Sequence, residues 1–427
     1  MGRFYNGACH CGPSIILRSN LYNLSIYCYK YPPNNGVGGR RWSLFTKRFI
    51  ELGHHVRVVS KLPDSPAPQF KNHTFLKKRK YRLFPWERKS NESKAIWHLQ
   101  KIFAKLTSRG IIWEEVIYLK KEIIAAVQQD IDNEVDFIIV SCAPFRWAYY
   151  ISKYLTEYEG KKPKLIVDIR DPWSNNKLSY FSSSSSKVIR EEAEFERFTI
   201  THSDHVFFVA KEDADNAIKQ HATASISWLP NGAHLKMESK HITPLNKRSS
   251  KDQMHIVFAG TLYRDGEESF VKFIKNLNTQ FEQNNQPLPH WTIIGDWSPQ
   301  TIDKVSKITD CSFLGVIKSD AIKQEILNAD FACSYVSPKL NYAINTKIIE
   351  AAALRVPIIL LSKEGSVSEF LIRNNLGVHI DLTKNNSNLI VEWYNQNLAT
   401  GPWQDFNEFD INSLVDQRII KALDALA

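Results

Sequence analysis

The sequence predicts an α/β protein with two Rossmann-like, doubly wound domains that face each other across a cleft. Strand-like and helix-like segments alternate through most of the 427 residues, a length too great for one ordinary core. A polar stretch without periodicity, at 233–253, interrupts this alternation once. We therefore expect an open parallel sheet, covered by helices on both faces, on each side of that stretch.

The first series of apolar, β-branched or aromatic segments is typical of buried parallel strands. These segments are LSIYCYK (24–30), HVRVVS (55–60), DFIIVSC (136–142), KLIVDIR (164–170) and HVFFVA (205–210). Between the first two, Trp42, Phe45 and Phe49 recur at helical spacing. Gly53 follows where a helix C-cap belongs, so we expect a helix over 41–53.

The second series begins after the polar stretch. Its segments are MHIVFAG (254–260), HWTIIG (290–295), CSFLGV (311–316), ADFACSYV (329–336), VPIILLS (356–362) and GVHIDL (377–382). We divide the chain into a first domain (1–235), a linker (236–253) and a second domain (254–405). A terminal helix (406–427) is expected to pack back toward the first domain. Ligands of such sheets bind beyond the carboxyl ends of the strands, so the cleft is the expected site.

Composition and termini point to a globular, cytoplasmic protein. Hydrophobic residues make up 43% and charged residues 23%, and no apolar run approaches the roughly 18 residues that span a bilayer. The first twenty residues lack the features of a signal peptide. Cys9 and Cys11 flank His10, but their spacing is not that of a zinc site and no second Cys/His pair follows. We expect no metal there.

The net charge of +10 is concentrated at 71–94, where nine Lys or Arg residues meet two Glu. Aromatic residues alternate with these charges, which suits nucleic acid or an anionic membrane surface. Nothing else resembles a nucleic-acid-binding module, so of these two we favour peripheral contact with the inner face of the cell membrane. An ordinary solvated loop is the alternative.

A glycine-containing loop precedes the first helix. Gly36, Gly38 and Gly39 allow a sharp turn and close approach of a ligand to the helix N-terminus. The spacing is not G-x-G-x-x-G, so the dinucleotide fingerprint is absent. A tight turn without a ligand is the alternative.

The stretch PP-x(4)-GG-RRW at 32–42, followed by a helix, resembles the opening of the family 4-like glycosyltransferases of the GT-B fold. Further blocks match in order over roughly 24–381: 140–155, 165–176, 191–218, 229–233, 256–266, 326–338, 345–362 and 365–381. The resemblance implies a metal-independent, hexosyltransferase-like enzyme without cofactors. It would move a sugar from a nucleotide-sugar donor to a saccharide or lipid-linked acceptor, with retention, as in bacterial surface-polysaccharide or lipopolysaccharide synthesis.

The block NTKIIEAAALRVPII holds the expected donor site. Asn345 or Thr346 can cap the following helix, whose N-terminus then faces phosphate. Lys347 can offer an ammonium group to a diphosphate, and Glu350, on the same helical face, can accept from ribose hydroxyls. The alternative is an exposed Lys–Glu pair. The family often carries a second glutamate eight positions earlier; Tyr342 stands there, which leaves the contact with the sugar unassigned.

The resemblance also assigns Arg264, in the loop after the first strand of the second domain, to the donor diphosphate. Arg264 and Lys347 would then stabilise the charge on the leaving group, as a metal does elsewhere. Gly38 and Gly39 would approach the donor from the first domain. An ordinary surface arginine is the alternative for Arg264.

The acceptor side is predicted to include Arg40, Arg170 and Asp171. Asp171 ends a first-domain strand and could orient or deprotonate the acceptor hydroxyl, or could pair with Arg170. Asp168 lies on the other side of that strand and is expected to be structural.

Two other signals are interpreted as structural. Asp213 and Asp215 form a D-x-D, but they stand at a predicted helix start, where acids complement the helix dipole. His54 and His55 stand at a helix end. Two rival functions remain open: a nucleotide-sugar epimerase or hydrolase of the same fold, and a non-catalytic sugar-nucleotide-binding protein.

Overall fold

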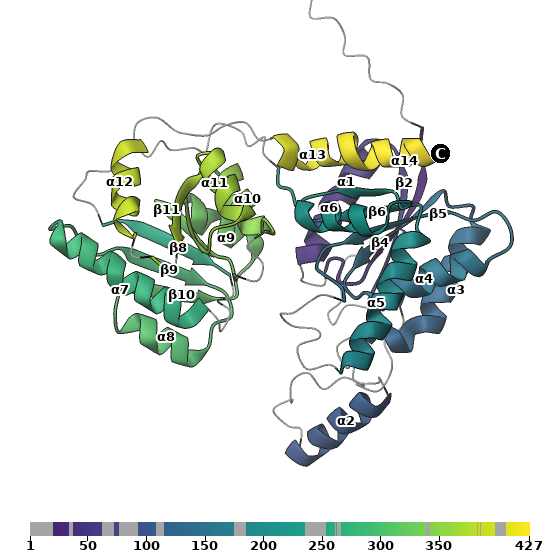
Figure 1. The fold of residues 1–427 in the computed structure, drawn as a ribbon, viewed down its shortest axis with the longest axis horizontal. Helices are drawn as coiled ribbons and strands as arrows, with labels where there is room; N and C mark the ends of the chain where they lie inside the picture. The colour runs from purple at the N-terminus through teal and green to yellow at the C-terminus, as the bar shows by residue number, and fades with distance from the viewer. Residues whose placement is uncertain are drawn as a thin grey trace, which may run out of the picture.

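The computed structural model describes residues 20–33, 37–61, 72–76, 93–107, 115–174, 185–234, 253–260, 262, 266–338, 342–381, 383–384, 386–397 and 407–427. Two parallel sheets, each flanked by helices, lie side by side (Figure 1). The predicted α/β class with two Rossmann-like sheets is confirmed.

The first sheet has seven parallel strands in the order β3-β2-β1-β4-β5-β6-β7. They are β1 (Asn23–Cys28), β2 (His55–Lys61), β3 (His73–Leu76), β4 (Phe137–Cys142), β5 (Lys164–Ile169), β6 (His205–Phe208) and β7 (Ile226–Trp228). All five predicted strands are present. The two unpredicted ones, β3 and β7, are short edge strands that are mostly half-buried, so they lack the continuous apolar run of a central strand.

Helices cover this sheet on both faces. They are α1 (Val37–Glu51), η1 (Glu115–Leu119), α3 (Lys120–Asp132), α4 (Arg146–Glu157), α5 (Ser186–Thr201) and α6 (Lys211–Gln220). A further helix of this half of the chain, α2 (Lys94–Thr107), lies away from the sheet (Figure 1). Trp42, Phe45 and Phe49 on α1 are fully buried, as their helical spacing predicts. Gly53 has φ +93°, which confirms a glycine C-cap after this helix.

The second sheet has six parallel strands in the order β10-β9-β8-β11-β12-β13, and all six were predicted. They are β8 (His255–Ala259), β9 (His290–Ile294), β10 (Cys311–Gly315), β11 (Phe331–Tyr335), β12 (Ile358–Ser362) and β13 (Gly377–Asp381). Their helices are α7 (Glu267–Gln283), α8 (Pro299–Ser306), α9 (Ser319–Leu327), α10 (Thr346–Ala353), α11 (Ser366–Arg373) and α12 (Asn388–Asn397).

The C-terminal segment lies along the first sheet's helical layer, beside α1 (Figure 1, yellow). After η5 (Asn407–Phe409) come α13 (Ile411–Leu414), the π-turn η6 (Val415–Ile419) and α14 (Ile420–Leu426). Its apolar residues share one core with Trp42, Phe45 and Phe49. Asp416 accepts a 2.6 Å hydrogen bond from Arg48 of α1. The chain therefore ends on the first sheet, although its preceding 150 or so residues build the second.

In the described part of the chain, no helix is both long enough and apolar enough to cross a membrane.

A buried carboxylate joins α1 to the first sheet. Asp168 on β5 is fully buried and accepts from Trp42 Nε1 at 2.6 Å and from Arg41 Nη2 at 3.1 Å. The Arg41 guanidinium also donates to the carbonyl oxygens of Leu229, at 2.7 Å, and Pro230. The structural interpretation of Asp168 holds in this geometry.

Asp168→Ala should lower the free energy of unfolding by about 3–5 kcal/mol, because it leaves the Arg41 guanidinium buried without its counter-charge. Urea unfolding followed by tryptophan fluorescence measures this loss. Asp416→Ala is the matched control: it removes a half-exposed partner of Arg48 and should cost about 1 kcal/mol or less. Equal costs for the two variants would contradict the assignment.

Candidate functional site

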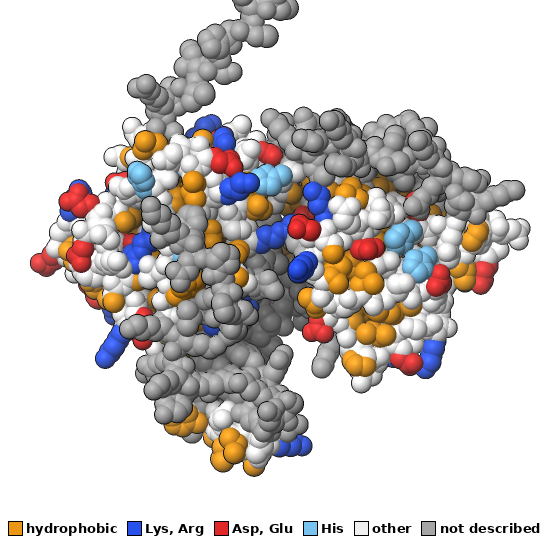
Figure 2. Space-filling view, turned by 180° about the vertical axis from the view of Figure 1, so that it is seen from behind, with side chains coloured by type: hydrophobic (Ala, Val, Ile, Leu, Met, Phe, Trp, Pro, Cys, Tyr) orange, Lys and Arg blue, Asp and Glu red, His pale blue; other side chains and the backbone are white. Residues whose placement is uncertain are grey.

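The candidate site lies where the carboxyl ends of the two sheets meet, and Figure 2 shows basic and acidic side chains together at the junction of the domains. The start of α1 contributes Gly38, Gly39 and Arg40. The loop after β5 contributes Arg170 and Asp171, and the start of α10 supplies further groups from the second domain.

Packing within the protein requires a glycine at position 39, where a side chain would meet backbone, and crowds any side chain at position 38 against Arg170. A Cβ on Gly38 would lie 1.8 Å from Arg170 Nη1, and one on Gly39 would lie 1.8 Å from the carbonyl oxygen of Lys30. The Arg170 guanidinium lies against Gly38 and donates to the carbonyl oxygens of Cys142 and Ala143, the latter at 3.1 Å. Arg170 therefore fixes the loop after β5 against the start of α1. Its neighbour Asp171 is exposed.

Asn345, and not Thr346, caps α10. Its Oδ1 accepts from the backbone N–H of Ile348 at 3.0 Å, and its Nδ2 donates to Ser334 Oγ at 3.2 Å. Thr346 is the first helical residue. The capping amide thus also ties the helix N-terminus to the end of β11, so the free N–H groups of the first turn have a fixed direction.

The ammonium group of Lys347 lies over Gly260, at the end of β8. A Cβ on Gly260 would be 1.9 Å from Lys347 Nζ, and the glycine has φ +148°. The lysine side chain is open to solvent, but protein crowds it, and this desolvation lowers its pKa, opposed by Glu350. A partly desolvated cation held over a strand end favours an anionic ligand.

Glu350 forms an ion pair between the two domains. Its Oε1 lies 2.7 Å from Nη1 of Arg40, with about a quarter of the glutamate side chain exposed and about half of the arginine. Desolvation raises the pKa of Glu350, while Arg40 and Lys347 act in the opposite direction. Arg40, predicted on the acceptor side, therefore contacts a residue predicted to bind the donor.

Acidic groups of the first domain face Tyr342 of the second. Desolvation, followed by the charges of Asp213, Glu212 and Asp171, raises the pKa of Tyr342 to about 12. Desolvation and neighbouring acids, chiefly Glu212, raise the pKa of Asp213 to about 6. Of the predicted D-x-D, Asp213 stands in the first turn of α6 together with Glu212, as the helix-start interpretation predicts, whereas Asp215 lies beyond that turn. The place of Glu212 and Asp213 at the junction was missed, although α6 follows the carboxyl end of β6, next to β5.

Two predicted features lie outside the described residues: Arg264 and most of the basic stretch 71–94. Cys9 and Cys11, where we expect no metal, also lie outside the described residues. Within the described ranges, no group of three or more His, Cys, Asp or Glu side chains is arranged to hold a metal ion.

No family model and no curated protein matches this chain. Solved structures do. The sucrose-phosphate synthase from Thermosynechococcus elongatus has a TM-score of 0.59 at 13% identity, covering 94% of this chain and 96% of that one. WaaG, a glycosyltransferase involved in lipopolysaccharide biosynthesis, has a TM-score of 0.55 at 13% identity, covering 94% and 98%. A protein from Listeria monocytogenes described as a UDP-N-acetylglucosamine 2-epimerase has a TM-score of 0.57 at 12% identity, covering 95% and 97%.

The chain has the GT-B fold. Both sheets and nearly the full length of each neighbour take part in the match, so the predicted fold is confirmed. At these identities the likeness establishes architecture alone, and the resemblance to the family 4-like group stays a prediction.

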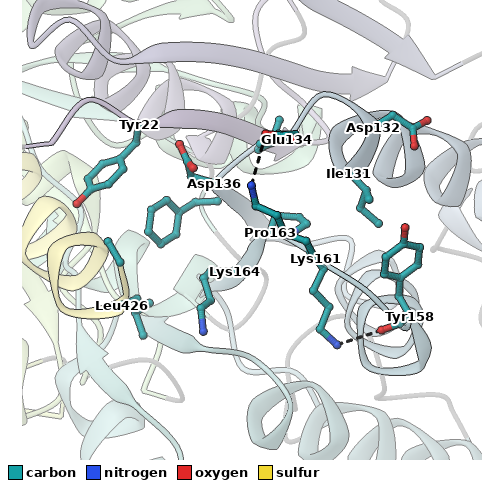
Figure 3. A pocket seen from close by; sticks show the side chains of 14 residues that line it. Tyr22, Ile131, Asp132, Glu134, Asp136, Tyr158, Lys161, Pro163, Lys164 and Leu426 are labelled. Carbon is teal, nitrogen blue, oxygen red and sulfur yellow. Dashed lines mark hydrogen bonds and ion pairs between the residues drawn. The ribbon is translucent and has the colours of Figure 1, made fainter.

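A surface cavity of about 560 Å³ lies at the opposite edge of the first GT-B domain. Figure 3 shows it at the amino ends of the strands, with Tyr22 before β1, Asp136 before β4 and Lys164 at the start of β5. Its lysines already have partners: Lys161 Nζ lies 3.4 Å from Glu134 Oε2, and Lys164 Nζ lies 3.1 Å from Asp204. We do not assign the chemistry to this cavity, because ligands of such sheets bind at the other edge.

Gly260→Ala should displace the Lys347 ammonium and strain a backbone with φ +148°, at a cost of about 1–3 kcal/mol in unfolding free energy. We also expect nucleoside diphosphate binding to weaken about tenfold or more, because a charge-assisted contact is lost. Calorimetric titration and thermal unfolding measure the two effects.

Gly315→Ala is the matched control for that change. Gly315 also has positive φ, +63°, but a Cβ there would meet nothing within 4 Å. It should cost some stability and leave nucleotide affinity unchanged. If both alanine variants bound nucleotide like the unmodified protein, Lys347 would not be a phosphate ligand.

Asp213→Asn should stabilise the protein at neutral pH. The pKa of Asp213 is raised to about 6, so its ionised form destabilises the folded state above that pH, and the penalty disappears as pH falls toward 4. The gain at pH 8 has an upper limit of about 3 kcal/mol, which solvent screening reduces. Thermal unfolding at pH 8 and pH 4 tests this. Asp215→Asn, two residues on and exposed, is the control, and an equal gain there would contradict the burial argument.

Proposed function

We propose that the chain is a glycosyltransferase that moves a sugar from a nucleotide-sugar donor to a saccharide or lipid-linked acceptor. The observation that carries this is the juxtaposition of Lys347 and Glu350, one helical turn apart on α10, with Arg40 across the domain junction. WaaG and a protein from Rickettsia africae are named as glycosyltransferases, and a trehalose-phosphate synthase from Burkholderia vietnamiensis (TM-score 0.58, 12% identity) is named as UDP-forming.

The donor diphosphate would lie between the N-terminus of α10 and the end of β8. Lys347 would bind its oxygens there, together with the first-turn N–H groups and the Thr346 hydroxyl. Arg264, in the loop after β8, would add a second cation. As the bond from sugar to phosphate breaks, negative charge grows on the diphosphate, and both cations would stabilise it without a metal ion or another cofactor.

Glu350 would hold the ribose. A carboxylate accepts two hydroxyl hydrogen bonds and offers no competing donor while it is ionised. Arg40 pairs with Oε1 of the same carboxylate. Ribose hydroxyls would therefore replace one partner of Glu350, and the freed Arg40 guanidinium would remain at the junction, next to the acceptor side.

The acceptor would bind on the first domain. Asp171 is exposed at the end of β5, while Arg170 is fixed by the carbonyl oxygens beyond β4. Asp171 would orient or deprotonate the acceptor hydroxyl. We infer retention of configuration and a role in cell-surface polysaccharide synthesis, with residues 71–94 contacting the cytoplasmic face of the membrane.

One neighbour supports an alternative, because a protein described as an epimerase matches this chain as well as the transferases do. Tyr342, in place of the family's second glutamate, would also suit a protein that binds nucleotide sugars without transferring them. Nucleotide release that needs an added acceptor favours transfer. Release or epimerisation without an acceptor favours the epimerase or hydrolase. Binding without turnover favours the non-catalytic binding protein.

Glu350→Gln should weaken binding of the preferred nucleoside diphosphate about tenfold and abolish the preference for ribose over 2′-deoxyribose, because an uncharged amide accepts less strongly. A thermal-shift screen of UDP, GDP and dTDP, with their sugar conjugates and CMP conjugates, identifies the ligand. Calorimetry then compares its ribose and deoxyribose forms.

Glu369→Gln on α11 is the matched control, since Glu369 is exposed in the same domain. It should bind like the unmodified chain. An unchanged ribose preference in Glu350→Gln would contradict the donor-site assignment, as would unchanged transfer activity in Arg264→Ala.

A further inference from the structure

Helix α2 projects from the first domain with apolar side chains on its outer surface. Figure 1 places it at the far end of α5, away from both sheets, and Figure 2 shows hydrophobic side chains gathered at this protrusion. Ile96, Leu99, Ile102 and Phe103 are each more than half exposed. Exposed apolar residues normally occur singly, so four within two turns of one helix mark an interaction surface.

The arrangement of these residues follows the helical period. Ile96, Leu99 and Phe103 stand at i, i+3 and i+7, and Ile102 adjoins them, so they form one stripe. Trp97 and Gln100 fall on another side of the helix and are half-buried. The most apolar stripe of the helix is thus more exposed than a side that includes a polar residue, the reverse of a helix that serves only its own domain.

The charge of α2 is entirely positive. Lysines occupy positions 94, 101 and 105 and His98 lies among them, while the helix contains no Asp or Glu. Spacings of four, three and four residues place these positions on one stripe, on the side of the helix roughly opposite the apolar one. The preceding sequence, 71–93, adds eight Lys or Arg against two Glu. A partner must therefore offer an apolar interior beneath a negatively charged surface.

We propose that α2 is an interfacial anchor that lies in the surface of an anionic lipid bilayer. Its stripe of Ile96, Leu99, Ile102 and Phe103 enters the acyl boundary, and the net positive charge of the helix and of the preceding sequence attracts it to lipid phosphates.

This inference deepens the membrane contact proposed for 71–94 by naming a folded element that inserts. It also agrees with an acceptor held by the first domain, because α2 belongs to that domain. It does not depend on sugar transfer, so the two can fail separately.

The test measures sedimentation of the full chain with vesicles of equal parts phosphatidylglycerol and phosphatidylcholine. The double variant Ile96→Ser, Leu99→Ser should bind these vesicles at least about tenfold more weakly than the unmodified chain, because two inserted apolar side chains are lost. Ile372→Ser is the matched control: Ile372 is 62% exposed on α11 of the second domain, and its replacement should leave partitioning unchanged. Nucleoside diphosphate affinity should be equal in all three proteins, which shows that the donor site is intact.

Three results would overturn the proposal. One is unchanged vesicle binding in the double variant. Another is equal binding of the unmodified chain to pure phosphatidylcholine vesicles, since anionic lipid would then be unnecessary. The third is a dimer of the unmodified chain that dissociates in the double variant during sedimentation velocity, because the stripe would then bind a second copy.

Discussion

The buried carboxylate of Asp168 is the interaction on which the first half of the site depends. It holds Arg41 and Trp42 of α1, and the same arginine holds the carbonyl oxygens at Leu229 and Pro230, where the chain leaves the first domain. Arg41 and Trp42 directly follow Arg40 in the sequence. The network therefore fixes the start of α1, and with it Arg40, at the edge of the sheet. Desolvation lowers the pKa of Arg41, and Asp168 opposes that shift, so the guanidinium is stable there only with its carboxylate.

The fold could be predicted from the sequence because most of its strands are continuous apolar runs. The helical spacing of Trp42, Phe45 and Phe49 also indicates which face of α1 is buried. Strands β3 and β7 escaped prediction because edge strands need no such run. Within the site, residues on one element could be grouped by helical spacing, as for Lys347 and Glu350. The Arg40–Glu350 ion pair could not be predicted in this way, and neither could the proximity of Asp213 to Tyr342. Both depend on how the two domains meet, which no local sequence pattern encodes.

The two sides of the junction differ in charge. The second domain presents Lys347 at the end of β8, while the first presents Asp171, Glu212 and Asp213 at the ends of β5 and β6. Such a division suits a donor whose diphosphate lies against one domain and an acceptor with neutral hydroxyls against the other. Arg40, Arg170 and Glu350 depart from this division: the first-domain Arg40 pairs with Glu350 of the second domain, and Arg170 donates to backbone carbonyl oxygens of its own domain.

Tyr342 is consistent with this division. A glutamate at that position would face three carboxylates of the first domain, and each ionised neighbour would raise the free energy of its own ionised form. A tyrosine avoids this repulsion because it is neutral at physiological pH, and desolvation and the same acids raise its pKa further, to about 12. Its hydroxyl still offers one donor at the junction. A neutral tyrosine therefore fits the acids that α6 and the β5 loop bring to the opposite side, so residues of both domains must be considered together when this part of the junction is interpreted.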